Sequence, residues 1–326
     1  MAIYNSVRST AICRSLLTIA LFAIPQLTQA QWQATVGAQS GDLAKQAMAF
    51  LPGEMWIHAG DSITWTFETA EPHTVSFLKV GQVRPPDQIG CPGFSPDGFA
   101  IFDGSACVTT PRLKEGQTYT VTFPTANNFK LVCLIHRNMT ATVHVLGLAE
   151  PLPHDQGFYD RQAQQERERL LSAIDLGSHD EHSGENHVNA GAGVISATPG
   201  GSENVVVMRF DQEKTFIHAG ETVEWSNSDP TASHTITFGV EPADPMTPSG
   251  NVTVQSDGAR HAQINSPADS VHSGFIVASP QERTGLPQLP PGVTRFRVTF
   301  MQPGVYPYIC AIHDELGMKG TVIVLP

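Results

Sequence analysis

The chain carries the same sequence pattern twice, roughly half its length apart. Residues 56–65 read WIHAGDSITW and residues 216–225 read FIHAGETVEW. The match resumes at 119–123 (YTVTF) and 296–300 (FRVTF) and runs to the end of each half. Repeats that must stack to acquire a core are roughly 20–50 residues long, so copies this much longer are complete folding units. We therefore predict two domains of similar fold.

Short stretches within each copy alternate apolar and polar residues, for example 120–123, 142–146 and 321–325. This period is typical of strands that are buried on one face. Turn signals such as Ala59-Gly60-Asp61 and Pro303-Gly304 separate the stretches. Many short strands with little helical periodicity predict an all-β protein, with a sandwich of antiparallel sheets in each half.

The segment between the copies has a different composition. Residues 161–171 are strong helix formers without Gly or Pro, and Gly177 follows as a stop signal, so we predict one linker helix. Residues 178–201 are polar and rich in Gly, which predicts a flexible connection. The predicted division is a signal peptide at 1–30, a first domain at 31–150, a linker with a short helix at 151–193 and a second domain at 194–326.

The N-terminus has the pattern of a secretory signal peptide. Arg8 and Arg14 precede an apolar stretch at 16–24, and small residues around Ala30 suit cleavage before Gln31. About 10 apolar residues fall short of the roughly 20 that span a bilayer. We expect a periplasmic or secreted protein without stable membrane insertion.

Four cysteines remain after the signal peptide is removed. Cys91 and Cys107 enclose a loop of about 15 residues in a Pro/Gly-rich insertion at 78–118, and in an oxidising compartment such a pair predicts a disulfide. A second insertion, at 240–293, is rich in Pro, Ser and Gly and suits a long, partly ordered loop. The two other cysteines belong to a repeated motif.

That motif reads CLIHRNM at 133–139 and CAIHDELGM at 310–318, and one histidine stands upstream of each copy. Two imidazoles and a thiolate in a plane, with a distant axial thioether, describe a type 1 (blue) copper site. Zinc also accepts Cys and His, but its structural sites are built from Cys and His without Met. The sequence therefore predicts two copper sites, with the ligands His73, Cys133, His136 and Met139 in one and His234, Cys310, His313 and Met318 in the other.

Both halves resemble cupredoxins of the plastocyanin and amicyanin group. Four residues separate His313 from Met318, as in plastocyanin-like loops, while two separate His136 from Met139, as in amicyanin-like loops. The resemblance implies that each half is a Greek-key β-sandwich with one mononuclear type 1 copper, held by the ligands named above.

The ligand set predicts electron transfer, with copper cycling between Cu(I) and Cu(II), and no enzyme activity. A multicopper oxidase or nitrite reductase would need a further copper cluster, and the His-x-His pairs that supply one are absent from the sequence. Copper storage, delivery or sensing stays open as an alternative. The formal net charge of −12 argues against nucleic acid and anionic membranes as partners and suits a basic redox protein as donor or acceptor.

Overall fold

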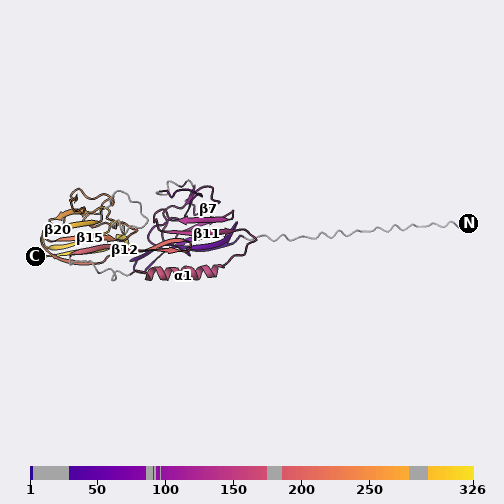
Figure 1. Ribbon diagram of the computed structural model, residues 1–326, viewed down its shortest axis with the longest axis horizontal. Helices are drawn as coiled ribbons and strands as arrows, with labels where there is room; N and C mark the ends of the chain where they lie inside the picture. The colour runs from indigo at the N-terminus through magenta and orange to yellow at the C-terminus, as the bar shows by residue number, and fades with distance from the viewer. Residues whose placement is uncertain (3–28, 86–90, 92, 96, 175–185, 279–292) are drawn as a thin grey trace.

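The computed structural model describes residues 1–2, 29–85, 91, 93–95, 97–174, 186–278 and 293–326. Two β-sandwiches lie end to end along the long axis, and helix α1 covers one face of the first (Figure 1). The predicted signal peptide lies almost entirely outside the described residues. No helix within the described ranges is long and apolar enough to cross a membrane.

The first domain contains two groups of hydrogen-bonded strands. One group runs in the order β2 (Lys45–Leu51), β1 (Gln31–Gln39), β4 (Ser62–Phe67), β9 (Thr118–Thr122) and β7 (Phe99–Ile101). The other runs β3 (Glu54–His58), β11 (Thr140–Leu146), β10 (Asn127–Val132), β5 (Ser76–Phe77), β8 (Val108–Thr109) and β6 (Gly93–Phe94).

The second domain repeats this arrangement, except at one end of each group. Its first group is β13 (Gly201–Phe210), β12 (His187–Thr198), β15 (Thr222–Ser228), β20 (Arg295–Phe300) and β18 (Arg260–Ile264), and it is extended by β17 (Thr253–Val254). Its second group is β14 (Lys214–His218), β22 (Lys319–Leu325), β21 (Gly304–Ile309) and β16 (Thr237–Phe238), and it ends at β19 (Val271–His272). The predicted all-β class, with one sandwich in each half, is confirmed.

Each sandwich has its own core, built by the alternation that the sequence shows. Along β4 and β15 every second side chain is buried, because successive side chains of a strand point to opposite faces. Trp65 and Trp225, at matching positions of the repeat, are fully enclosed in the two separate cores. The repeated tryptophan thus marks the centre of each sandwich.

The predicted linker helix is confirmed as α1 (Gln156–Ser172). The Asp155 carboxylate accepts a hydrogen bond from the backbone N–H of Phe158 at 2.8 Å, which caps the helix N-terminus. Tyr159 is buried against the first domain, and its hydroxyl accepts a hydrogen bond from the backbone N–H of Trp56 at 2.8 Å. The helix therefore packs onto the first domain, while Leu170 near its C-terminal end shares a buried apolar cluster with Val205 and Val207 of β13.

The prediction of a flexible connection over 178–201 is wrong for its second half. Strand β12 begins at His187, inside the segment assigned to the linker, and β13 follows from Gly201. Val188 and Ala190 alternate with polar residues and are fully buried. Their small size and the surrounding glycines concealed the strand period. Strands β17, β18 and β19 likewise give local order to the 240–293 insertion, of which 279–292 lie outside the described residues.

Strand β13 also joins the two domains. It pairs with β12 of its own domain and with β2 of the first, where Asn204 lies opposite Met48. A further pairing places Thr140 of β11 opposite Ser202. Backbone hydrogen bonds across both edges of one strand fix the domains to one another more firmly than the linker alone would.

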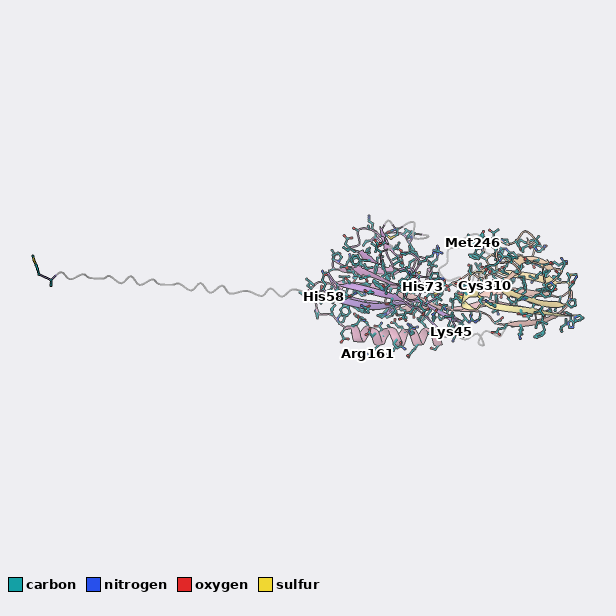
Figure 2. All side chains as sticks on the ribbon, turned by 180° about the vertical axis from the view of Figure 1, so that it is seen from behind. Lys45, His58, His73, Arg161, Met246 and Cys310 are labelled. Atoms are coloured by element: carbon teal, nitrogen blue, oxygen red, sulfur yellow. A yellow bond between two sulfur atoms is a disulfide. The ribbon has the colours of Figure 1, made fainter. Side chains whose placement is uncertain are left out.

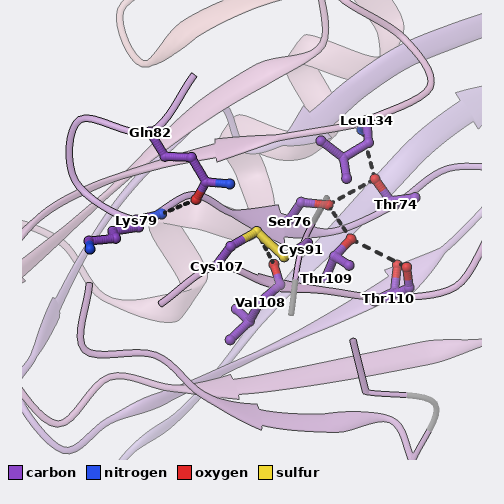
Figure 3. The surroundings of a disulfide bond; sticks show 10 residues. All are labelled: Thr74, Ser76, Lys79, Gln82, Cys91, Cys107, Val108, Thr109, Thr110 and Leu134. Carbon is purple, nitrogen blue, oxygen red and sulfur yellow. Dashed lines mark hydrogen bonds between the residues drawn. A yellow bond between two sulfur atoms is a disulfide. The ribbon is translucent and has the colours of Figure 1, made fainter. Parts of the chain in front are cut away.

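The predicted Cys91–Cys107 disulfide is present in the insertion of the first domain (Figure 3). Hydroxyl groups connect this region to the predicted copper loop. Thr109, two residues after Cys107, exchanges a 2.6 Å hydrogen bond with Ser76, and the Thr74 hydroxyl accepts from both Ser76 and the backbone N–H of Leu134.

Removing this disulfide should destabilise the protein. We expect Cys91→Ser/Cys107→Ser to lower the free energy of unfolding by about 3 kcal/mol, because closing a loop of this length restricts the unfolded chain. Urea unfolding of the first domain measures the change, and the reduced unmodified protein should match the variant. A loss below about 1 kcal/mol would show that the insertion is held by its other contacts.

Candidate metal centres

Each predicted thiol lies where a strand ends beside an upstream histidine. Cys133 follows β10 and Cys310 follows β21, and these strands pair with β5 and β16, which begin just after His73 and His234. The backbone of His73 is held by two reciprocal hydrogen bonds to Leu113, both 2.9 Å long. His234 makes the same reciprocal contact with Ile276. The backbone of each upstream histidine is therefore held in place by a neighbouring segment, beside the strand end that carries the cysteine.

The first cluster brings His73, Cys133 and His136 together. The two Nδ1 atoms lie 3.0 Å apart, and the Cys133 Sγ lies 4.0 Å from Nδ1 of His73 and 3.7 Å from Nδ1 of His136. His73 and Cys133 have no solvent exposure. Three donor atoms thus converge on one enclosed point.

The second cluster has the same atoms in the same arrangement. Nδ1 of His234 and Nδ1 of His313 lie 3.1 Å apart, and the Cys310 Sγ lies 3.9 and 3.4 Å from them. In each cluster the donor atoms all lie within 4.8 Å of one another. The repeat is preserved at atomic detail.

The donor atoms fit a trigonal metal ion. With bonds of about 2.0 Å to nitrogen and about 2.3 Å to sulfur, as for zinc, a planar site places its nitrogens about 3.5 Å apart and each nitrogen about 3.7 Å from sulfur. The observed separations lie near these values. Two ring nitrogens that face each other can share only one proton between them, whereas a cation satisfies both and the thiolate as well.

The two methionines occupy matching places although their loops differ in length. The backbone N–H of Cys133 donates to the carbonyl oxygen of Met139 at 3.0 Å. The backbone N–H of Cys310 donates to the carbonyl oxygen of Met318 at the same distance, 3.0 Å. Both methionines are fully buried. In the second loop a 3-10 turn, η3 (Asp314–Leu316), takes up the additional residues. The two loops differ in length, but the same backbone hydrogen bond between cysteine and methionine closes each of them.

Electrostatics favours thiolates at both positions. Burial raises the pKa of Cys133, but the adjacent imidazoles of His136 and His73 outweigh it and hold the pKa well below its usual value. Cys310 shows the same balance between burial and its two histidines. A deprotonated thiol is the form that binds soft metal ions.

The surroundings of the clusters differ in ways that the motif does not reveal. Asp229 Oδ2 lies 3.5 Å from Nε2 of His234, and neither side chain is exposed. The repeat aligns Asp229 with Thr69, and among the described residues no ion pair joins a carboxylate to Nε2 of His73. Neither Nε2 atom makes a hydrogen bond there, so the difference between the clusters is the nearby charge. In the first cluster a carboxylate instead lies on the other imidazole, where Glu71 Oε1 is 3.3 Å from Nε2 of His136.

The sulfur atoms also receive different hydrogen bonds. The backbone N–H of Thr74 points at Cys133 Sγ at 3.5 Å, and that of Thr235 points at Cys310 Sγ at 3.3 Å. Among the described residues, a threonine hydroxyl adds a second contact at Cys310 alone, where Thr235 Oγ1 lies 3.8 Å from Sγ. Alignment of the two halves could have flagged Asp229 against Thr69, but not these contacts.

With copper bound at the second cluster, the buried Asp229 carboxylate is expected to lower the redox potential there. A negative charge about one imidazole ring away from a metal ion stabilises the oxidised form over the reduced form. The difference is on the order of 2 kcal/mol at an effective dielectric constant of about 20. For a one-electron couple this is roughly 80 mV. We expect Asp229→Asn to raise the potential of the second centre by this order, measured by spectroelectrochemistry of the Cys133→Ser protein. The exposed Asp257→Asn variant, which removes an equal charge, should leave the potential unchanged, and an equal shift in both variants would contradict the assignment.

Comparison with known proteins agrees with the geometry. The chain matches the copper-binding proteins of the plastocyanin/azurin family over residues 38–146 and 197–325. No curated protein matches it.

Solved structures similar to parts of the chain come from the same group. Oxidised plastocyanin from Dryopteris crassirhizoma is 19% identical, covers 43% of this chain and 99% of its own, and gives a TM-score of 0.22. A reduced Cu(I) form of an amicyanin mutant is 24% identical, covers 35% of this chain and 82% of its own, and gives a TM-score of 0.24. The family match covers both halves, including all eight predicted ligands, and on that match the chain belongs to the plastocyanin/azurin family of copper-binding proteins, as a tandem cupredoxin.

Proposed function

We propose that the protein is an exported electron carrier that holds one type 1 copper in each domain. The observation that carries the proposal is the convergence of Nδ1, Sγ and Nδ1 within 4.8 Å in both domains. His73, Cys133, His136 and Met139 would hold one copper. His234, Cys310, His313 and Met318 would hold the other. Bound copper supplies a one-electron couple between Cu(I) and Cu(II).

The chain's own residues keep each donor set fixed. Reciprocal backbone bonds hold the upstream histidine, a backbone bond from cysteine to methionine closes the loop, and burial excludes water. When the ligands are held in fixed positions, the geometry of the site changes little as the metal gains or loses an electron. The reorganisation energy of electron transfer is then small. This rigidity favours electron transfer over release of copper to a receiving protein.

Substrate chemistry would require a position open to a substrate. The clusters of His and Cys found among the described residues are these two, and both are largely enclosed, with His313 5% exposed and His136 13% exposed. We therefore infer a carrier and not an oxidase or reductase. The acidic chain suits a basic redox protein as its partner.

A reductive titration tests this function. Oxidised protein loaded with copper should accept two electrons per chain, lose its visible absorption and regain it on reoxidation over repeated cycles. A storage or delivery protein would instead hold Cu(I) and show little visible absorption. N-terminal sequencing of the secreted protein tests export, and we expect the mature chain to begin at Gln31.

A further inference from the structure

The ligand loop of the second domain packs into the first domain. Leu316 lies between His313 and Met318 on this loop, is 6% exposed, and belongs to the same buried apolar cluster as Cys133 and Met139. Its backbone N–H donates to the carbonyl of His313 at 3.1 Å. A residue bonded to one predicted ligand of the second centre thus shares a core with two predicted ligands of the first.

Arg209 of β13 fixes this contact. One guanidinium nitrogen donates to the carbonyl of Leu316 at 2.6 Å, and another donates to the carbonyl of Asp42, in the β1–β2 turn, at 2.7 Å. Gly317, with φ +91°, leaves room for the guanidinium, since a Cβ there would lie 3.1 Å from it. Together with the pairing of β13 and β2, Arg209 holds the two loops in one relative position.

The Glu71 carboxylate contacts a predicted ligand of the first centre. Its Oε1 contacts Nε2 of His136 at 3.3 Å, and both side chains are 13% exposed. Glu71 therefore contacts an imidazole of the first centre, while Leu316 is bonded to His313 of the second. Figure 2 shows His73 and Cys310 at the facing ends of the two sandwiches.

We propose that the two centres exchange an electron directly within one chain, across the junction formed by Glu71, Leu316 and the imidazoles of His136 and His313. This proposal rests on the proposed function, since it requires copper at both positions. With copper held by both ligand sets, the junction would carry one electron from the reduced centre to the oxidised one, with no bond formed or broken and no proton required. The protein is then one connected relay, and His313, which is 5% exposed, is not available to an external partner.

Substoichiometric reduction tests the exchange. Fully oxidised protein is given less than one electron per chain by a light pulse, and the redistribution between centres is followed by absorption and by freeze-quench electron paramagnetic resonance. We expect a first-order phase whose rate does not change with protein concentration and which is absent from Cys133→Ser and Cys310→Ser. A redistribution rate proportional to protein concentration would overturn the proposal.

A second comparison tests Glu71 as a positioning residue. We expect Glu71→Gln to slow the first-order phase by roughly tenfold, the size of effect typical of residues that surround metal ligands. Glu150→Gln, an exposed change near His58 at the far end of the first domain, should leave the rate unchanged. The potentials of both centres are measured in each variant to separate driving force from coupling, and an unchanged rate in Glu71→Gln would remove Glu71 from the route. Failure of the proposed function is distinct, since oxidised protein would then lack the two visible bands before any pulse.

Discussion

Cys310→Ser is expected to bind one copper per chain in place of two and to lose the visible absorption of the second centre while keeping that of the first. The intense absorption of a blue copper site depends on the thiolate, and the serine hydroxyl is a hard donor that copper does not favour. Cys133→Ser should likewise bind one copper per chain, losing the visible absorption of the first centre and keeping that of the second. Metal analysis and visible absorption of both variants measure the effect.

The two variants act as controls for one another because the clusters lie in separate cores. Their difference spectra should add up to the spectrum of the unmodified protein. The double variant should retain the fold and lose both bands. Retention of the full spectrum in either single variant would show that the corresponding cluster is not a copper site.

Gly191→Ala is expected to weaken copper binding at the second centre by roughly 10- to 100-fold, the cost typical of changes around metal ligands. Gly191 lies on β12 with φ +75°, and a Cβ there would lie 2.3 Å from Nε2 of His234. The added methyl group would therefore push against the His234 imidazole, and that ring cannot move away without displacing its Nδ1 atom from the other metal-binding atoms. Copper titration of the Cys133→Ser protein with and without the change measures the loss.

Gly220→Ala is the matched control. Gly220 also has a positive φ, +90°, but a Cβ there meets nothing within 4 Å. Both variants carry a comparable backbone cost of about 1 kcal/mol, and only Gly191→Ala displaces a predicted ligand. Equal copper affinity in the two variants would contradict the role assigned to Gly191.

The two clusters of His and Cys and the sandwich fold could be predicted from the sequence because both are local and repeated. A strand reveals itself by alternation, and Cys310, His313 and Met318 lie on one loop, so spacing alone places them together. The upstream histidine required only the comparison of the two halves. The clusters that the structure forms contain the histidines and cysteines that the sequence singled out.

The junction between the domains could not be inferred in this way. Strand β13 pairs with β2 across a long sequence separation, and no pattern in either strand specifies which edge it meets. Asp229 and Glu71 are ordinary acidic residues until the fold buries them beside imidazoles. Strand β12 was missed because its sequence, VNAGAGV at 188–194, is built mainly from small residues and glycine. The difference in hydropathy between its buried and exposed positions is therefore small.

Copper content and visible absorption of the unmodified mature chain test the central claim most directly. After loading with Cu(II) and removal of excess metal, the account predicts two copper atoms per chain, both associated with intense thiolate-to-copper absorption that disappears on reduction. One copper per chain, or two coppers without that absorption, would contradict it.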